Sequence, residues 1–292
     1  MENNNIGNEK IYFGSPSAIT VTDTGSPETF PPHWHNAAEF TIATKDGCKY
    51  RVGGRLFSLC AGDVLLVWPG QVHETVKIPP SSAIFIQFPS VIIDNNLDLV
   101  SISGLLRSFN LLPAKDFPET ASFISEKIHE IQKIYVSDDP LSETKCKIFI
   151  YEILLKIGEH VLYHETKYDE SGLLSGAVRG YIRAACSFIM ANSSDDISQE
   201  DVSSHIGLST YYFSRLFNQY MHMSFSSYLA NLRVRNATNL LLNDELSITE
   251  CAFMAGFQST TSFNRVFHDV TGYSPREYKK MIIQEAYSKK KI

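Results

Sequence analysis

The sequence predicts a chain of two domains, an N-terminal all-β barrel with helices attached and a C-terminal all-α domain. Three observations lead to this prediction. Short apolar runs separated by turn residues extend from about residue 11 to residue 88, helical spacing replaces them after Pro118, and a C-terminal segment repeats at an offset of 50 residues. The length of 292 residues agrees with two domains, because single cores rarely grow beyond about 250 residues.

Five short apolar runs in the first third of the chain have the composition of β-strands. These runs are Ala18–Val21, Glu39–Ala43, Lys49–Val52, Val64–Trp68 and Ala83–Phe88. Turn signals such as Asp46-Gly47, Gly53-Gly54 and Pro79-Pro80 separate them. Many short strands at this spacing are typical of a small barrel or sandwich.

Two helical stripes follow the predicted barrel. Apolar residues from Phe123 to Ile134 share one helix face, and those from Cys146 to Val161 share the face of a second helix. Charged residues, serine and glycine between about His164 and Ser175 indicate a linker. The predicted organisation is a barrel over 1–116, a helical segment over 117–164, a linker over 165–176 and a helical domain over 177–292.

An internal repeat is the strongest signal in the chain. Phe213–Phe217 aligns with Phe263–Phe267 at an offset of 50 residues. The same offset superposes Ser224 on Ser274 and Tyr228 on Tyr278. Each copy has the parts of a helix-turn-helix, in which a short amphipathic helix and a turn with glycine precede a helix whose outer face can enter a major groove.

Capping residues support the expected helix boundaries. The helices are expected over 199–206 and 210–219 in the first copy and over 249–255 and about 259–270 in the second. Ser247 with Glu250 forms a capping box, and Ser198 with Asp201 forms a weaker one. Apolar residues between Tyr228 and Leu241 suit one long helix that holds the two copies at a fixed separation.

These residues resemble the AraC/XylS family of bacterial transcription regulators over about residues 177–282. The most specific stretch runs from Ala255-Gly-Phe through Phe263-Asn-Arg-Val-Phe to Gly272-Tyr-Ser-Pro-Arg-Glu-Tyr. The resemblance implies two recognition helices and control of operons by small signals. Carried over position by position, it implies DNA contacts from Thr210, Tyr211, Ser214, Arg215, Thr260, Thr261, Asn264 and Arg265.

Not every residue of the repeat is expected to read DNA. Helical spacing places five apolar residues in the core, where they carry no sequence readout, namely Phe213, Leu216, Phe217, Phe263 and Phe267. Arg215 and Arg265 have the geometry to contact guanine or phosphate, and Asn264 can pair with adenine. The alternative for the two arginines is a solvated or salt-bridged side chain.

Composition excludes several classes of protein. No run approaches the roughly 18 uninterrupted apolar residues of a membrane span, and the polar N-terminus lacks the features of a signal peptide, so we expect a cytoplasmic protein. Five cysteines without a C-x-x-C pair argue against a disulfide framework or a thiolate metal site. The net charge is −6, yet residues 180–292 carry 11 basic and 10 acidic side chains, so charge neither supports nor excludes nucleic acid.

A second constellation lies in the predicted barrel. His33, His35 and Glu39 have the same strand parity, and His73 arrives from a later strand, so the four side chains are expected to converge. This pattern resembles the cupin barrel over about residues 30–75, whose metal enzymes use three histidines and one carboxylate. Together with the C-terminal half, it resembles the sugar-sensing domain of many AraC-family regulators.

Three interpretations of this constellation compete. In the first, His33, His35, Glu39 and His73, with the aromatic faces of Tyr50 and Trp68, line a pocket for a polar effector, with a sugar favoured. In the second, the histidines and the carboxylate bind a divalent ion such as Zn, Ni, Mn or Fe. In the third, the histidines are satisfied by buried hydrogen bonds and bind nothing.

The sequence as a whole predicts a sequence-specific regulator and not an enzyme. The expected partners are double-stranded promoter DNA, a small effector, RNA polymerase and a second copy of the chain, paired through the helical dimerisation segment over 117–164. No cofactor is required, and a divalent metal in the barrel is the alternative. A metal-dependent cupin enzyme is the rival function, but a catalyst has no evident need for a tandem DNA reader.

Overall fold

A computed structural model describes residues 7–9, 11, 19–23, 25, 28–164, 175–221 and 223–280. The chain forms two compact units. The first consists chiefly of Ser17–Asp94 and Leu105–Tyr168, and the second consists chiefly of Asn95–Gly104 and Asp169–Ile292. Within the described ranges, no helix is both long and apolar enough to cross a membrane. Most of the predicted linker, up to residue 174, lies outside the described residues.

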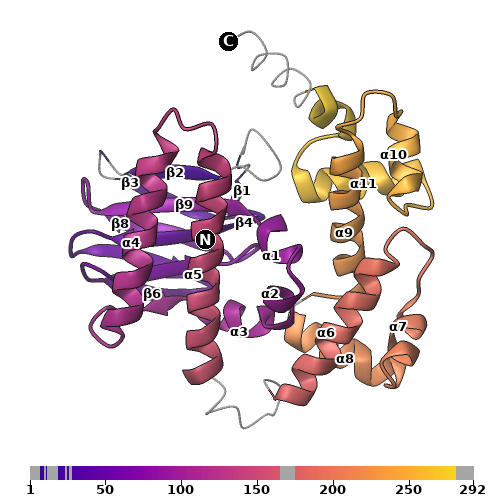
Figure 1. Cartoon of the computed structure of the whole chain (residues 1–292), viewed down its shortest axis with the longest axis horizontal. Helices are drawn as coiled ribbons and strands as arrows, with labels where there is room; N and C mark the ends of the chain where they lie inside the picture. The colour runs from indigo at the N-terminus through magenta and orange to yellow at the C-terminus, as the bar shows by residue number, and fades with distance from the viewer. Residues whose placement is uncertain are drawn as a thin grey trace, which may run out of the picture. The chain divides into compact units, whose positions relative to one another are not determined.

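The first unit is built on two five-stranded sheets (Figure 1). One sheet has the strand order β1-β3-β8-β5-β6, and the other has the order β10-β7-β4-β9-β2. The strands are β1 (Gly7–Asn8), β2 (Thr20–Asp23), β3 (Glu28–Trp34), β4 (Ala37–Ala43), β5 (Cys48–Val52), β6 (Arg55–Leu59), β7 (Val64–Val67), β8 (His73–Ile78), β9 (Ala83–Pro89) and β10 (Leu111–Leu112). Each of the five predicted runs overlaps a strand, although Ala18 of the first run lies outside the described residues, and the all-β class of this unit is confirmed.

Burial along the strands follows from their positions in the sheets. β4 lies between β7 and β9 and is buried at every position. β5 alternates between buried and exposed residues, as expected for a strand with one face towards the core. Tyr50, Leu59, Leu65 and Ile78 belong to the apolar core of this unit.

Two long helices, α4 (Pro118–Tyr135) and α5 (Ser142–His164), pack against each other beside the sheets (Figure 1). Proline at the start of α4 suits the first helical turn, where a backbone N–H has no partner within the helix. Ile124 and Ile128 of α4 are fully buried, as are Ile150 and Leu154 of α5. Both predicted helical stripes are therefore confirmed.

Three short helices that follow β9 in the chain and precede β10 were not predicted. They are α1 (Val91–Asp94), α2 (Leu97–Ser101) and α3 (Ser103–Ser108). The Asn96 side chain caps α2 by accepting from the backbone N–H groups of Asp98 and Leu99. α2 belongs to the second unit, where the Tyr220 hydroxyl donates to the Ser101 carbonyl at 2.6 Å.

The second unit contains the two predicted helix-turn-helix copies. Its remaining helices are α6 (Gly176–Ala191), α7 (Gln199–His205), α8 (Thr210–Met221), α9 (Phe225–Leu240), α10 (Ile248–Met254) and α11 (Thr260–Thr271), and residues 275–280 are also helical. Both capping boxes are present. The Ser198 and Ser247 hydroxyls accept from the N–H groups of Asp201 and Glu250, whose carboxylates accept from the serine N–H groups. The all-α class of this unit is confirmed.

Helix α9 contributes to both cores of the second unit. Its first half packs Phe225 and Tyr228 with Phe213 and Phe217 of α8. The core that contains Phe263 and Phe267 of α11 also contains Val234 and Ala237, from the second half of α9. Leu241, the residue that caps the end of α9, belongs to the same core. The residues that the helical spacing placed in the core are buried there, namely Phe213, Leu216, Phe217, Phe263 and Phe267.

The turn of the second copy leaves no room for a side chain. Gly256 has a φ of 96°, and a Cβ added there would lie 2.5 Å from the Ser193 carbonyl oxygen and 2.8 Å from Nε of Arg233. That guanidinium donates to the same carbonyl at 2.9 Å and so cannot simply move away. Gly207 of the first copy has a φ of 71°, but no atom lies within 4 Å of an added Cβ.

We therefore expect Gly256→Ala to destabilise the second unit more than Gly207→Ala. Gly207→Ala incurs only the left-handed backbone penalty of about 1–2 kcal/mol. Gly256→Ala adds a clash with backbone and should cost about 3 kcal/mol or more. Urea unfolding followed by circular dichroism measures both values. Equal losses in the two variants would show that the close approach at Gly256 does not constrain the fold.

Candidate functional site

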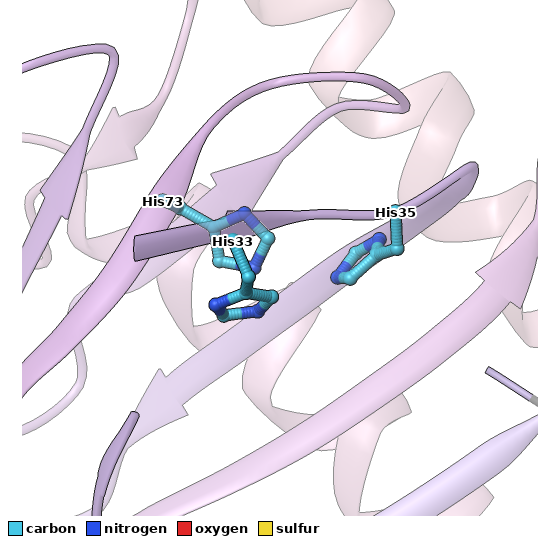
Figure 2. A group of neighbouring side chains, drawn as sticks. All are labelled: His33, His35 and His73. Carbon is cyan, nitrogen blue, oxygen red and sulfur yellow. The ribbon is translucent and has the colours of Figure 1, made fainter. Parts of the chain in front are cut away.

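Three buried histidines meet at one end of the β3–β8 pair. His33 lies on β3 directly opposite His73 at the start of β8, and His35 follows β3 by one residue. Figure 2 shows the three rings grouped together. The ring centroids of His33 and His73 are 4.1 Å apart, and those of His35 and His73 are 4.7 Å apart. The side chains are between 1% and 7% exposed.

The backbone orients all three rings in the same way. Each Nδ1 lies at hydrogen-bond distance from a carbonyl two residues away, at 2.8 Å from Pro31, 3.0 Å from Ala37 and 2.9 Å from Gln71. A carbonyl oxygen only accepts, so each Nδ1 carries the proton. A neutral ring then presents an Nε2 lone pair. Within the described chain, Nε2 of His35 and Nε2 of His73 are buried without a hydrogen-bond partner.

Glu39 places a negative charge beside the histidines. Its Oε2 lies 3.7 Å from Nε2 of His35, which is too long for a hydrogen bond. The carboxylate accepts instead from Thr41 Oγ1 at 3.1 Å and from Gln87 Nε2 at 3.0 Å. Burial opposes its ionisation, but His35, His73 and the Gln87 hydrogen bond outweigh burial and lower the pKa of Glu39 to about 2. Glu39 is therefore a buried anion.

A second carboxylate, Glu9, was not predicted from the sequence. It follows β1, the two-residue strand that pairs in parallel with β3. Its Oε2 lies 3.3 Å from Nε2 of His33. This contact lowers the pKa of Glu9, and it helps raise the pKa of His33 against the opposing effect of burial. Burial lowers the pKa of His73. No sequence motif predicts Glu9 at this site, because only the β1–β3 pairing brings it there.

The predicted aromatic residues have different places in this unit. Tyr50 is fully buried, and its hydroxyl lies 3.4 Å from Thr41 Oγ1, which itself donates to Glu39. Tyr50 thus joins the polar network at the carboxylate. Trp68 is also buried, and its indole N–H donates to the Phe109 carbonyl at 2.9 Å. That bond fixes Trp68 as part of the barrel packing.

The second candidate site is the outer surface of α8 and α11. Most of the residues predicted to contact DNA are exposed there, and Ser214 and Thr260 are half-buried. The exposed residues are Thr210, Tyr211, Arg215, Thr261, Asn264 and Arg265. Tyr211 is 78% exposed. Arg265 lies 3.8 Å from Asp269 on the same helix face, a solvent-exposed pair that holds it weakly.

Comparison with known proteins finds matches in both units. A model for the AraC-like ligand binding domain matches residues 18–135, and a model for a helix-turn-helix domain matches residues 202–281. The melibiose operon regulatory protein of Escherichia coli K12 is 22% identical over 260 residues, which is 88% of this chain and 86% of that protein.

Two further matches cover 36% and 38% of this chain. The regulatory protein PocR of Salmonella typhimurium is 35% identical over 106 residues, and the matched region spans only 35% of its length. The crystal structure of an AraC-type DNA-binding regulator from Chromobacterium violaceum is 27% identical. It covers 38% of this chain and 98% of its own, with a TM-score of 0.35.

Proposed function

The chain belongs to the AraC family of transcription regulators, and from this premise we propose that α8 and α11 read one operator in two successive major-groove segments. The shared helix α9 carries the proposal, because it packs into the cores of both copies and holds their recognition helices in one rigid unit. A single chain can then address two groove segments about 34 Å apart.

Base readout is assigned to the exposed polar residues of the two helices. Arg215 and Arg265 suit bidentate bonds to guanine, Asn264 suits adenine, and the threonines suit phosphates or thymine methyl groups. Tyr211 adds an exposed ring at the start of α8. The proposed site of action is promoter DNA in the cytoplasm, where contact with RNA polymerase would change transcription.

We expect Arg215→Ala and Arg265→Ala each to weaken operator binding by about 1–3 kcal/mol, because each removes a bidentate base contact. Gel-shift titration at fixed salt, with DNA from upstream of the regulated genes, measures the loss of affinity. Arg55→Ala, on an exposed hairpin of the other unit, is the control and should bind as the wild type does. Wild-type affinity in both recognition-helix variants would contradict the assignment.

The proposed effector is a small polar molecule, with a sugar favoured. Support comes from the match to an AraC-like ligand binding domain and from the likeness, over 88% of this chain, to a regulator named for the melibiose operon. Effector binding would shift the population between DNA-binding arrangements of the chain. The assignment of sugar contacts to the predicted lining residues stays a prediction.

A panel of sugars tests this proposal. We expect a saturating cognate sugar to change operator affinity by about 5- to 150-fold, the usual range of coupling between two sites. Gel-shift titration with galactosides, pentoses and polyols, against glycerol as a control, gives the readout. Unchanged affinity across the panel would contradict a sugar effector and leave DNA binding itself untouched.

A second copy of the chain is the proposed partner of α5. Ile148 and Leu155 are 51% and 58% exposed and stand seven residues apart on one helix. An apolar pair at this spacing suits a helix–helix seam between two copies.

We expect Leu155→Glu to shift the protein towards monomer, because it places a charge in the proposed seam. Sedimentation velocity over a range of concentrations measures the change. Lys77→Glu, an exposed charge substitution on β8, should leave the association state as it is. Identical sedimentation of wild type and Leu155→Glu would place the dimer contact elsewhere.

The rival function, a metal-dependent cupin enzyme, has weaker support. The named relatives are regulators. The two helix-turn-helix copies make up most of the second unit, and catalysis in a barrel does not require them. We therefore propose that the chain acts through DNA and is not an enzyme.

A further inference from the structure

The histidine cluster leaves little room for a sugar between its rings. A centroid separation of 4.1 Å between His33 and His73 is direct ring contact. A sugar ring placed among the three Nε2 atoms would have to push the imidazoles apart. Their potential ligand atoms lie within 4.8 Å of one another, a separation that one ion can bridge after small side-chain rotations.

The chemistry of the cluster calls for a cation. The Nδ1 bonds to backbone carbonyls leave Nε2 as the remaining ring nitrogen of His35 and His73, and both Nε2 atoms are buried without a hydrogen bond. Buried nitrogens without a hydrogen bond are unsatisfied, and a metal ion bound to them would satisfy both. A backbone bond at the opposite ring nitrogen is also the arrangement that orients metal-binding histidines. Glu39 adds a buried negative charge beside them.

We propose that His33, His35 and His73 bind one divalent first-row transition-metal ion through their Nε2 atoms. Imidazole donors favour Zn²⁺, Co²⁺, Ni²⁺ or Fe²⁺ over Mg²⁺ or Ca²⁺. Ligand nitrogens about 2.0–2.1 Å from such an ion would lie about 3.3 Å apart. The rings therefore need to move by only about an ångström to bind the ion.

The two carboxylates have distinct roles in this site. Glu39 is held by Thr41 and Gln87, so it neutralises the ion from a fixed position next to His35. Glu9 is partly exposed and lies 3.3 Å from Nε2 of His33, and it supplies an exchangeable fourth ligand. Ion binding would then also tie β1 to the barrel. This inference goes beyond the proposed function, because it needs neither DNA binding nor a sugar.

Metal uptake by the full-length protein tests the proposal. The protein is purified without a polyhistidine tag, stripped with chelator, freed of the chelator and dialysed against Zn²⁺ or Co²⁺. We expect one equivalent per chain by elemental analysis, visible d–d absorption with Co²⁺, and a higher melting temperature because the ion binds the folded state. No stoichiometric uptake by the folded wild-type chain would overturn the proposal.

A matched pair of variants locates the ion. His73→Gln should bind Co²⁺ at least about 100-fold more weakly, since removing a ligand costs more than removing its supporting partner. His129→Gln, at an exposed position on α4, should bind as the wild type does. Equal affinity in the two variants would overturn the site. Glu39→Gln repeats the test if His73→Gln does not fold, and it should also weaken binding. Operator affinity measured on the same samples separates failure of this site from failure of the regulator.

Discussion

The requirement that backbone amides and buried polar side chains find hydrogen-bond partners organises both units of this protein. In the second unit, serine and carboxylate side chains satisfy the free amides at the helix starts and so set where α7 and α10 begin. In the first unit, backbone carbonyls hold one nitrogen of each clustered histidine. The same rule makes the exceptions informative. Nε2 of His35 and Nε2 of His73 remain without hydrogen bonds in the described chain, at the point where a buried carboxylate also lies.

Helix α9 joins the two helix-turn-helix copies into one packed unit. A helix-turn-helix of this size buries too little apolar surface to be stable alone. Because Tyr228 and Leu232 complete one core while Val234 and Ala237 complete the other, neither copy can rotate without losing burial. Arg233, between these two sets, bonds the carbonyls of Ser193 and Asp195 in the loop after α6. The spacing of α8 and α11 is thus a property of the packing.

Periodicity predicted the elements with one strong face and missed those without one. The apolar runs that became β4, β7 and β9, and the stripes of α4 and α5, were visible because burial is continuous along them. No apolar run marks β3, which contains two prolines and was inferred only from the alternation of its histidine, and the short helices α1 to α3 have too few turns to show a period. In the site, the expected convergence of His33, His35 and Glu39 along one strand has a different basis, because β3 ends at Trp34, His35 lies in the turn that follows and Glu39 belongs to β4. Glu9 and Gln87 required strand pairing, which no local pattern encodes.

The charge distribution of the second unit bears directly on the proposed DNA contacts of α8 and α11. Residues 180–292 carry 11 basic and 10 acidic side chains, so the unit has almost no net charge with which to attract a duplex. Proteins that bind through many phosphate contacts lose affinity steeply with salt, by roughly one power of salt concentration for each phosphate neutralised. A unit with so little net positive charge must gain more of its affinity from fitted contacts in the groove. Fitted contacts in turn demand a fixed distance between α8 and α11, and this ties recognition of DNA directly to the packing of α9.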